Sequence, residues 1–261
     1  MGSSTRASLD NLRAQVATMA ASDELVSGVC EVGRAIAQHP PLLQALAHHG
    51  HSVDERTALL ASALPSVPAG VREVVASVVA QNWSKPADFL AGVEELAVRL
   101  ASKAAGSADV TGELLEVGRV IRGHSDLQLA MSDKRAQADA KMSLAQSLFG
   151  KKVSSVAMEI TKHLVALPRG RRVSDALSQA ASVVADQQGL GLAEVRVASS
   201  LAAAQETSLR ETLKKRFGRD HYLDVVVDPE VIGGVRIRVG DVVIDASVSK
   251  QLSDMRIQLA S

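Results

Sequence analysis

Cysteine, aromatic residues and long apolar runs are all scarce in this chain of 261 residues. The single cysteine, Cys30, excludes an intramolecular disulfide framework, and its apolar neighbours Val29, Val32 and Ile36 indicate that it packs as a small hydrophobic side chain. No run of about 18 apolar residues occurs, so the sequence predicts no transmembrane helix. Aromatic residues make up only 2% of the chain, and a core of Ala, Val and Leu suits closely packed helices.

A net charge is also absent, because 29 basic residues balance 29 acidic ones. The balanced chain has no overall attraction to nucleic acid or to an anionic membrane. Two local basic runs, Arg169–Arg172 and Lys214–Arg216, are interpreted as solvated helix ends. The first residues lack the apolar core of a signal peptide, and we expect them to begin a folded helix.

Motifs for catalysis and cofactor binding are missing as well. The sequence has no glycine-rich phosphate loop, and Gly189-Leu190-Gly191 precedes a predicted strand instead of following one. His48, His49 and His51, with His39 nearby, invite a metal-site interpretation, but no cysteine or well-spaced carboxylate completes such a site. We interpret these histidines as part of a polar loop between helices. The sequence therefore predicts no catalytic residue, no metal and no cofactor.

Up to about residue 190, the sequence has the apolar periodicity of helices. Leu9, Leu12 and Val16 begin one apolar stripe, and similar stripes follow along this region. Pro40-Pro41 ends one helix and suits the first turn of the next. Further helices are predicted at 54–64, 71–79 and 87–105.

The helical region contains an internal repeat. The segment Glu31–Ile36 returns as Glu116–Ile121, an offset of 85 residues (116 − 31). Without a gap, 11 of the 34 positions from 31 to 64 are identical to the positions 85 residues later. Such a match across a helix, a proline break and a second helix is improbable by chance. We interpret it as a duplication that gives two similar helical bundles in series.

From about residue 190 the apolar period changes to an alternation. The sequence predicts strands at 192–197, 223–227, 235–239 and 242–244, and a helix at 203–217 that Gly218 ends. Gly240-Asp241 is a tight turn between the last two strands. Ser247 is a suitable N-cap for a last helix, whose apolar stripe consists of Val248, Leu252, Met255 and Leu259. Together these elements predict a small α+β domain.

The stretch from Val225 to Ser247 closely resembles the signature of the delta subunit of F-type ATP synthases, called OSCP in mitochondria. That family shows an acidic residue, Gly-Gly, alternating apolar and basic residues, Gly-Asp, and Ile-Asp-Gly-Ser before the last helix. The residues that fall on this pattern are Asp228, Gly233, Gly234, Arg236, Arg238, Gly240, Asp241, Ile244, Asp245 and Ser247. Ala246 stands where the family usually has glycine, which is a mild departure.

Most of these signature residues have a structural interpretation. Gly233 and Gly234 suit a bulge or a close approach of the backbone, Gly240-Asp241 suits a turn, and Ser247 suits a cap. The signature therefore identifies the family through residues that determine the fold, and it contains no reactive centre.

The resemblance also implies an arrangement of domains. We expect an additional N-terminal helical bundle, a degenerate duplicate, at 1–105, and the family's own helical bundle at 106–190 with its first helix within 90–105. The α+β domain follows at 191–261. The expected fold is mainly α, with two tandem OSCP-like bundles followed by a small mixed domain, as in the longer delta subunits of actinobacterial type.

In function, the resemblance implies a non-catalytic stator subunit of a proton-translocating F-type ATP synthase. In the family, the helical domain binds the N-terminal helices of the alpha subunits, and the C-terminal domain binds the C-terminal ends of the b subunits. These contacts tie the catalytic head to the stator, so that rotation is coupled to ATP synthesis. The expected location is peripheral, at the cytoplasmic face of the bacterial plasma membrane. Without an anchor in this sequence, separate b-type subunits are expected.

Candidate contacts with b are the last helix, through Leu252, Met255 and Leu259, and the charged side of the sheet. Arg236 and Arg238 are able to pair with acidic b residues, and solvation is an equally plausible role for them. Two other functions stay open: a helical adaptor unrelated to ATP synthase, and a small-molecule enzyme with its site between the domains. The Gly-Gly to Ile-Asp-Ala-Ser signature argues against both.

Overall fold

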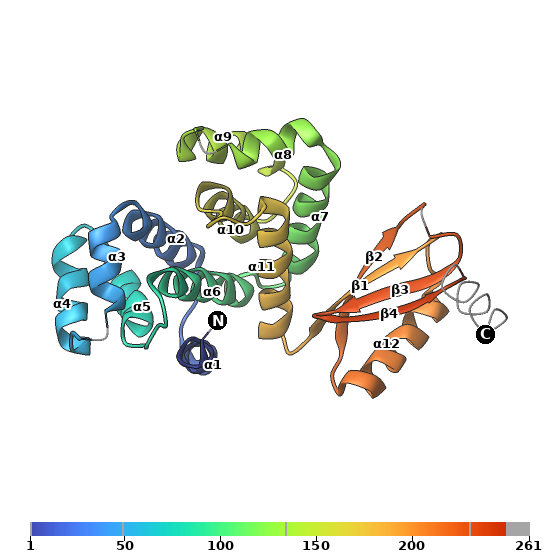
Figure 1. Cartoon of the computed structure of the whole chain (residues 1–261), viewed down its shortest axis with the longest axis horizontal. Coiled ribbons are helices and arrows are strands. Elements are labelled where there is room, and N and C mark those ends of the chain that lie inside the picture. The colour runs from blue at the N-terminus through green and yellow to red at the C-terminus, as the bar shows by residue number, and fades with distance from the viewer. Residues whose placement is uncertain (1, 49, 134, 230, 249–261) are drawn as a thin grey trace, which may run out of the picture. The chain divides into compact units, whose positions relative to one another are not determined.

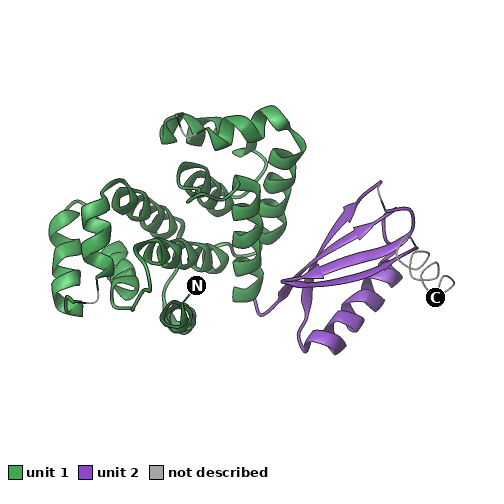
Figure 2. Ribbon diagram, in the orientation of Figure 1, with its two compact units in different colours: residues 1–187 green, residues 188–261 purple. Residues whose placement is uncertain are grey.

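The computed structural model describes residues 2–48, 50–133, 135–229 and 231–248. The chain divides into two compact units, Met1–Gln187 and Gln188–Ser261, which Figure 2 distinguishes by colour. The helices of the first unit are α1 (Ser3–Thr18), α2 (Asp23–Gln38), α3 (Pro40–Ala47), α4 (Val53–Ala63), α5 (Ala69–Val79), α6 (Pro86–Ala104), α7 (Val110–Gly123), α8 (Ser125–Ser132), α9 (Ala138–Phe149), α10 (Ser155–Ala166) and α11 (Val173–Gln187) (Figure 1).

Local sequence signals explain where several of these helices begin. Pro40 occupies the first turn of α3, where its missing N–H leaves no hydrogen bond unmade. The Ser52 side chain accepts a hydrogen bond from the Glu55 amide at 3.2 Å, while the Ser52 amide donates to the Glu55 carboxylate at 2.8 Å. This reciprocal pair is a capping box, and it satisfies backbone donors that have no partner within α4.

The order of helices repeats within the first unit. Helices α3 and α8 differ by 85 residues at both ends (125 − 40 and 132 − 47), the same offset as the sequence repeat. Helix α6 packs against α1, α2 and α5, and it also packs against α10 and α11. It is therefore the last helix of one bundle and the first helix of the next. The predicted pair of tandem bundles is confirmed, while the predicted boundary at residue 105 stays a prediction.

The two bundles are also joined by the packing of α2 against α10. Gly33 allows this close approach, because a Cβ atom there would come within 3.2 Å of the His163 ring and 3.0 Å of a Val93 methyl group. The Ser27 hydroxyl lies 3.5 Å from the Glu159 carboxylate across the same contact, and Cys30 is buried next to it. The predicted packing of Cys30 as a small hydrophobic side chain is thus confirmed.

The second unit is a four-stranded sheet with one described helix. Its elements are β1 (Gly191–Val197), α12 (Ala203–Phe217), β2 (His221–Val227), β3 (Gly234–Val239) and β4 (Val242–Ser247). The strand order is β2-β1-β3-β4. β1 and β2 are parallel and are connected through α12, whereas β3 is antiparallel to both of its neighbours. Together with the helical unit, this sheet confirms the predicted fold class.

Helix α12 covers one face of the sheet. The core beneath it consists of Ala193, Val195, Val197, Leu213 and Ile237. Gly218 ends α12 in the left-handed conformation, with φ 76°, and its amide donates to the Lys214 carbonyl at 2.8 Å. Because apolar and polar residues alternate along the strands, the apolar side chains face α12 and the charged side chains lie on the opposite face of the sheet.

Candidate partner-binding surfaces

The described signature residues lie on β3, on β4 and in the segments beside them. Asp228 follows β2, and its carboxylate accepts a hydrogen bond from Arg196 at 3.2 Å. Gly240, with φ 57°, forms the predicted turn between β3 and β4. Ser247 is the last residue of β4, and its hydroxyl donates to the Asp245 carboxylate at 2.6 Å. The helix that Ser247 was predicted to cap lies outside the described residues.

Gly234 is the signature residue with the strictest structural requirement. Its φ of +81° is in the left-handed region, which residues with a Cβ atom adopt only under strain. A Cβ atom at this position would also lie 2.3 Å from the backbone carbonyl oxygen of Ala246 on β4. Glycine is therefore required at position 234 for both conformation and space, as predicted from the Gly-Gly pair.

We expect Gly234→Ala to destabilise the second unit by about 2 kcal/mol or more, because strain and a clash with backbone atoms act together. Gly240→Ala is the matched control: it also has positive φ, but a Cβ atom there would meet nothing within 4 Å. The control should lose only about 1 kcal/mol. Hydrogen exchange of the β3 and β4 amides measures both losses, and equal losses would contradict the argument from the close approach.

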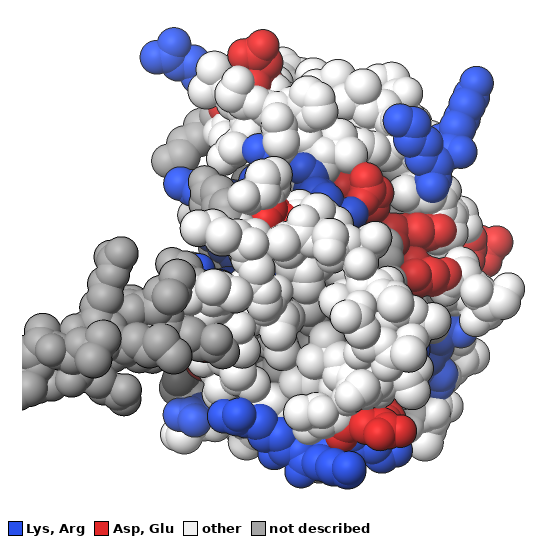
Figure 3. Space-filling model, turned by 90° about the vertical axis from the view of Figure 1, so that its right-hand side faces the viewer, with Lys and Arg blue, Asp and Glu red and all other residues white. Residues whose placement is uncertain are grey.

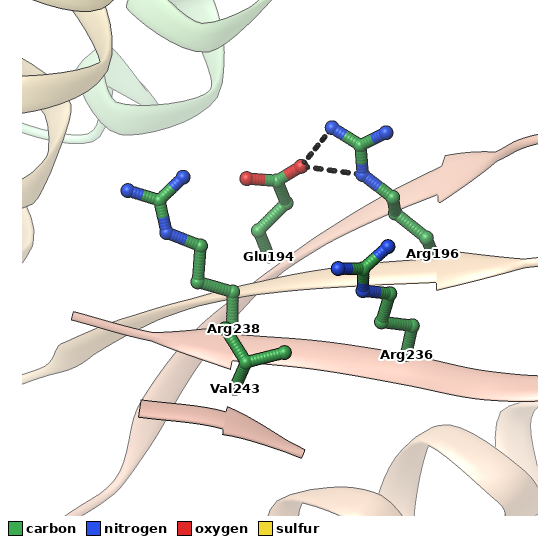
Figure 4. Close-up of a pocket in the computed structure, with 5 residues that line it drawn as sticks. All are labelled: Glu194, Arg196, Arg236, Arg238 and Val243. Atoms are coloured by element: carbon green, nitrogen blue, oxygen red, sulfur yellow. Dashed lines mark hydrogen bonds and ion pairs between the residues drawn. The ribbon is translucent and has the colours of Figure 1, made fainter. Parts of the chain in front are cut away.

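The face of the sheet opposite α12 carries a pocket. It is lined by four charged residues and one valine: Glu194, Arg196, Arg236, Arg238 and Val243. Figure 4 shows the three guanidinium groups on the same side of the sheet as the Glu194 carboxylate. Two arginines, Arg196 and Arg236, are directly opposite each other on neighbouring strands. Like charges in this position repel, so this face favours a partner that brings acidic groups.

Two of these arginines already have acidic neighbours. Arg196 donates to Glu194 at 2.8 Å, and this hydrogen bond and the Asp228 contact raise the pKa of Arg196. Arg236 lies 3.9 Å from Asp245. Arg238 donates to the Gly240 carbonyl at 3.3 Å and forms no ion pair with a described residue. Of the two predicted contact arginines, Arg238 is thus the more available to a partner.

The end of the sheet carries a second candidate surface, which is apolar. Val227, Ile232 and Val248 are 54%, 81% and 40% exposed there. They lie beside a groove that is lined by Leu201 and Leu209 on the α12 side and by Gly233–Val235 on the β3 side. We call Val227, Ile232, Val248 and Leu201 the sheet-end patch. Figure 3 shows uncharged side chains over the middle of one face, with both basic and acidic side chains around them.

The predicted contact residues of the last helix, Leu252, Met255 and Leu259, lie outside the described residues. Val248 is the last described residue, and its amide donates to the Gly233 carbonyl at 3.0 Å. The chain therefore leaves the described structure at the sheet-end patch. The proposed role of these three residues stays a prediction.

The interpretation of Arg169–Arg172 as a solvated helix end is wrong for two of its residues. The Glu94 carboxylate on α6 accepts from Arg169 at 3.1 and 2.9 Å and from Arg171 at 3.0 and 2.7 Å. All three side chains are largely buried, and Glu94 is only 8% exposed. Sequence patterns did not reveal this cluster, because Glu94 and the arginines are about 75 residues apart.

The two arginines outweigh the effect of burial on the pKa of Glu94. Burial by itself would raise the pKa of Glu94, but hydrogen bonds from Arg171 and the charges of both arginines outweigh burial and lower it. The carboxylate is therefore held in its charged form. It fixes the segment between α10 and α11 onto α6, and so stiffens the second bundle.

His163 on α10 is a second buried polar group, at the contact between the bundles. Its Nδ1 lies 3.3 Å from the Cys30 carbonyl, whereas its Nε2 has no hydrogen-bond partner among the described residues. Burial lowers the pKa of His163 to about 4. The imidazole is thus neutral at pH 7, which suits the packing of α2 against α10.

Neither a metal cluster nor a membrane-spanning helix is found within the described ranges. No three described His, Cys, Asp or Glu residues lie close enough together to hold a metal ion. The rings of His48 and His51 are 5.4 Å apart, and His49 lies outside the described residues. No described helix is both long and apolar enough to cross a bilayer.

Comparisons with known proteins agree on one family. The family model "ATP synthase delta (OSCP) subunit" matches residues 96–259. ATP synthase subunit delta of Leifsonia xyli subsp. xyli is 34% identical over 263 residues, which covers 100% of both chains. The subunits delta of Salinispora arenicola and Thermobifida fusca are 34% and 33% identical over 94% and 88% of this chain, and over 89% and 87% of their own lengths.

A chain in the cryo-EM structure of the Toxoplasma gondii mitochondrial ATP synthase hexamer is also similar. It is 18% identical, with a TM-score of 0.36, and the match covers 64% of this chain and 97% of that one. The match to the Leifsonia subunit, by contrast, extends over the whole chain and includes its N-terminal bundle. The chain therefore belongs to the ATP synthase delta (OSCP) subunit family, whose members are non-catalytic subunits of that complex.

Proposed function

We propose that this chain is a stator subunit that joins the alpha subunits of the catalytic head to the b-type peripheral stalk. The proposal rests on the full-length similarity to proteins named ATP synthase subunit delta. Its surfaces suit adhesion: an apolar sheet-end patch, a charged sheet face, and helical bundles able to bind a partner helix. A subunit of this kind holds the head against the torque of rotation and thereby couples rotation to ATP synthesis.

The proposed division of contacts follows the two units. The helical bundle near 106–190 binds the N-terminal helices of the alpha subunits, and the C-terminal domain at 191–261 binds the ends of the b subunits. Leu252, Met255 and Leu259 contribute to the b contact together with the sheet-end patch, and Arg238 pairs with acidic b residues. The subunit is peripheral, on the cytoplasmic face of the bacterial plasma membrane, where the complex transports protons.

A pull-down from detergent-solubilised bacterial membranes tests this division, with the full chain as bait. We expect it to recover alpha, beta and b subunits. Ile232→Asp places a charge in the sheet-end patch at a side chain that is 81% exposed, so the variant should fold normally, lose b and keep alpha. Val53→Asp is the matched control in the first unit, at a position that is 42% exposed, and it should keep b.

Two results would argue against the proposal. Recovery of no ATP synthase subunit by the folded full chain would exclude the stator role. Full retention of b by Ile232→Asp would exclude the sheet-end patch as the b contact.

A further inference from the structure

A histidine covers the point at which the chain enters the sheet of the second unit. Helix α11 is followed by the segment 188–190, and β1 begins at Gly191. The first two residues of this segment are exposed, whereas Gly191 is buried. His221, the first residue of β2, pairs with Gly191 in the parallel ladder. Gly191 is therefore the residue at which the connecting segment becomes part of the sheet.

Two contacts hold Gly191 at the start of β1. Its amide donates to the Asp220 carbonyl at 2.8 Å. The ring of His221 lies directly against it, because a Cβ atom at position 191 would come within 2.5 Å of Cδ2 and 2.7 Å of Nε2 of that ring. The glycine thus leaves the space that the imidazole fills, and the ring closes this end of the sheet.

The His221 ring is buried in a place that suits its neutral form. The residue is 4% exposed, and neither ring nitrogen has a hydrogen-bond partner within the described part of the chain. The ring of Phe217, at the end of α12, lies against it with the two centroids 5.5 Å apart. A neutral imidazole has one N–H to satisfy, whereas an imidazolium has two and also carries a charge. Burial without acceptors therefore disfavours the protonated ring.

Burial is the largest influence on His221, and it lowers the pKa of the ring below the ordinary value of 6.5. The charge of Arg219 lowers the pKa further, while the Arg219 backbone and the charge of Asp220 raise it. The buried position of the ring is thus fully favoured above pH 6.5. This advantage is lost as the pH falls toward the folded pKa.

The elements packed against the ring add basic groups. On α12, Lys214 pairs with Asp220 at 2.9 Å, and the Arg216 guanidinium lies 6.0 Å from the centre of the Phe217 ring. The start of β1 contributes a glycine, which has no side chain. Protonation of His221 would therefore add a positive charge to surroundings that already contain several.

We propose that His221 is a pH-dependent switch: the neutral ring holds Gly191 in the sheet, and protonation moves the ring into water and releases the start of β1. The protonated ring leaves because water offers the hydration and the two acceptors that its buried position lacks. Release extends the connection between the units beyond residue 190. The inference does not depend on the proposed function, because every contact that carries it lies within the second unit.

Hydrogen exchange of the full chain, followed by NMR at pH 7.5 and pH 5.0, tests this switch once the rates are corrected for the intrinsic effect of pH. We expect protection of the Gly191 amide to fall about threefold or more at the lower pH. The amide of Ile237, on the inner strand β3, should keep its protection. His221→Phe keeps an aromatic ring over Gly191 but cannot bind a proton, so its protection at position 191 should be independent of pH.

Two further variants complete the test. Gly191→Ala places a Cβ atom where the ring lies, so the ring has to move at every pH, and protection at position 191 should already be low at pH 7.5. His51→Phe, at an exposed histidine of the first unit, is the control and should respond to pH as the unaltered chain does.

Three results would overturn the switch. The first is equal protection of the Gly191 amide at both pH values in the unaltered chain. The second is a pH response in His221→Phe as large as that of the unaltered chain, because the responsible proton would then be bound elsewhere. The third is full protection of position 191 in Gly191→Ala at pH 7.5, because the ring would then not be what holds the start of β1.

Discussion

Replacement of Glu94 by glutamine is expected to lower the free energy of unfolding of the helical unit by about 3–5 kcal/mol. Glu94 is the acceptor for both Arg169 and Arg171, with four contacts between 2.7 and 3.1 Å. The glutamine side chain has nearly the same shape but no charge, so two partly buried guanidinium groups would lose their counter-charge. Urea unfolding followed by circular dichroism measures the loss.

Two further variants separate the charge effect from a general effect of substitution. Glu116→Gln removes an exposed pair with Arg119 on α7 and should change stability by less than about 1 kcal/mol. Replacing Glu94, Arg169 and Arg171 together with methionine removes all three charges, and should recover much of the stability that Glu94→Gln loses. A triple variant no more stable than Glu94→Gln would mean that the arginines are not the cause.

Acidification is expected to destabilise the helical unit through His163, by about 3 kcal/mol between pH 6.5 and pH 4. The ordinary pKa is 6.5, and burial lowers the pKa of folded His163 to about 4. Below pH 6.5 the unfolded chain therefore binds a proton that the folded chain excludes. The stability is complete above pH 6.5 and falls as the pH approaches the folded pKa.

The charged groups around His163 set the pH range in which its effect on stability can be measured. The charge of Glu94 raises the pKa of His163, whereas Arg34 and Arg169 lower it. Because the pKa of Glu94 is itself lowered from 4.5, its own contribution is lost only at more acidic pH. Between pH 6.5 and 5, His163→Gln should therefore show a shallower fall in stability than the unaltered chain. An NMR titration with a His163 midpoint near 6.5 would refute the prediction.

Local sequence signals predicted the elements well, because each rests on a conformational preference of one or two residues. Pro40 at the start of α3, Gly218 at the end of α12 and Gly240 in the β3–β4 turn all appear where the sequence placed them. The repeat at an offset of 85 residues predicted the tandem bundles, because segments with similar apolar patterns form similar helices. The resemblance in the Val225–Ser247 stretch predicted the family.

The contacts that join distant segments were not predictable in the same way. The partnership of Glu94 with Arg169 and Arg171 depends on the packing of α6 beside the α10–α11 segment, and the basic run itself suggested solvent exposure. The burial of His163 depends on a glycine, Gly33, in the other bundle.

Because α6 belongs to both bundles, neither bundle can be cut from the chain intact, and a force on one bundle also acts on the other. A cut after α6 would deprive the second bundle of its first helix, and a cut before α6 would deprive the first bundle of its last. The two bundles are therefore not exchangeable modules. A force applied to one bundle therefore reaches the other through α6, which belongs to both, and through the packing of α2 against α10.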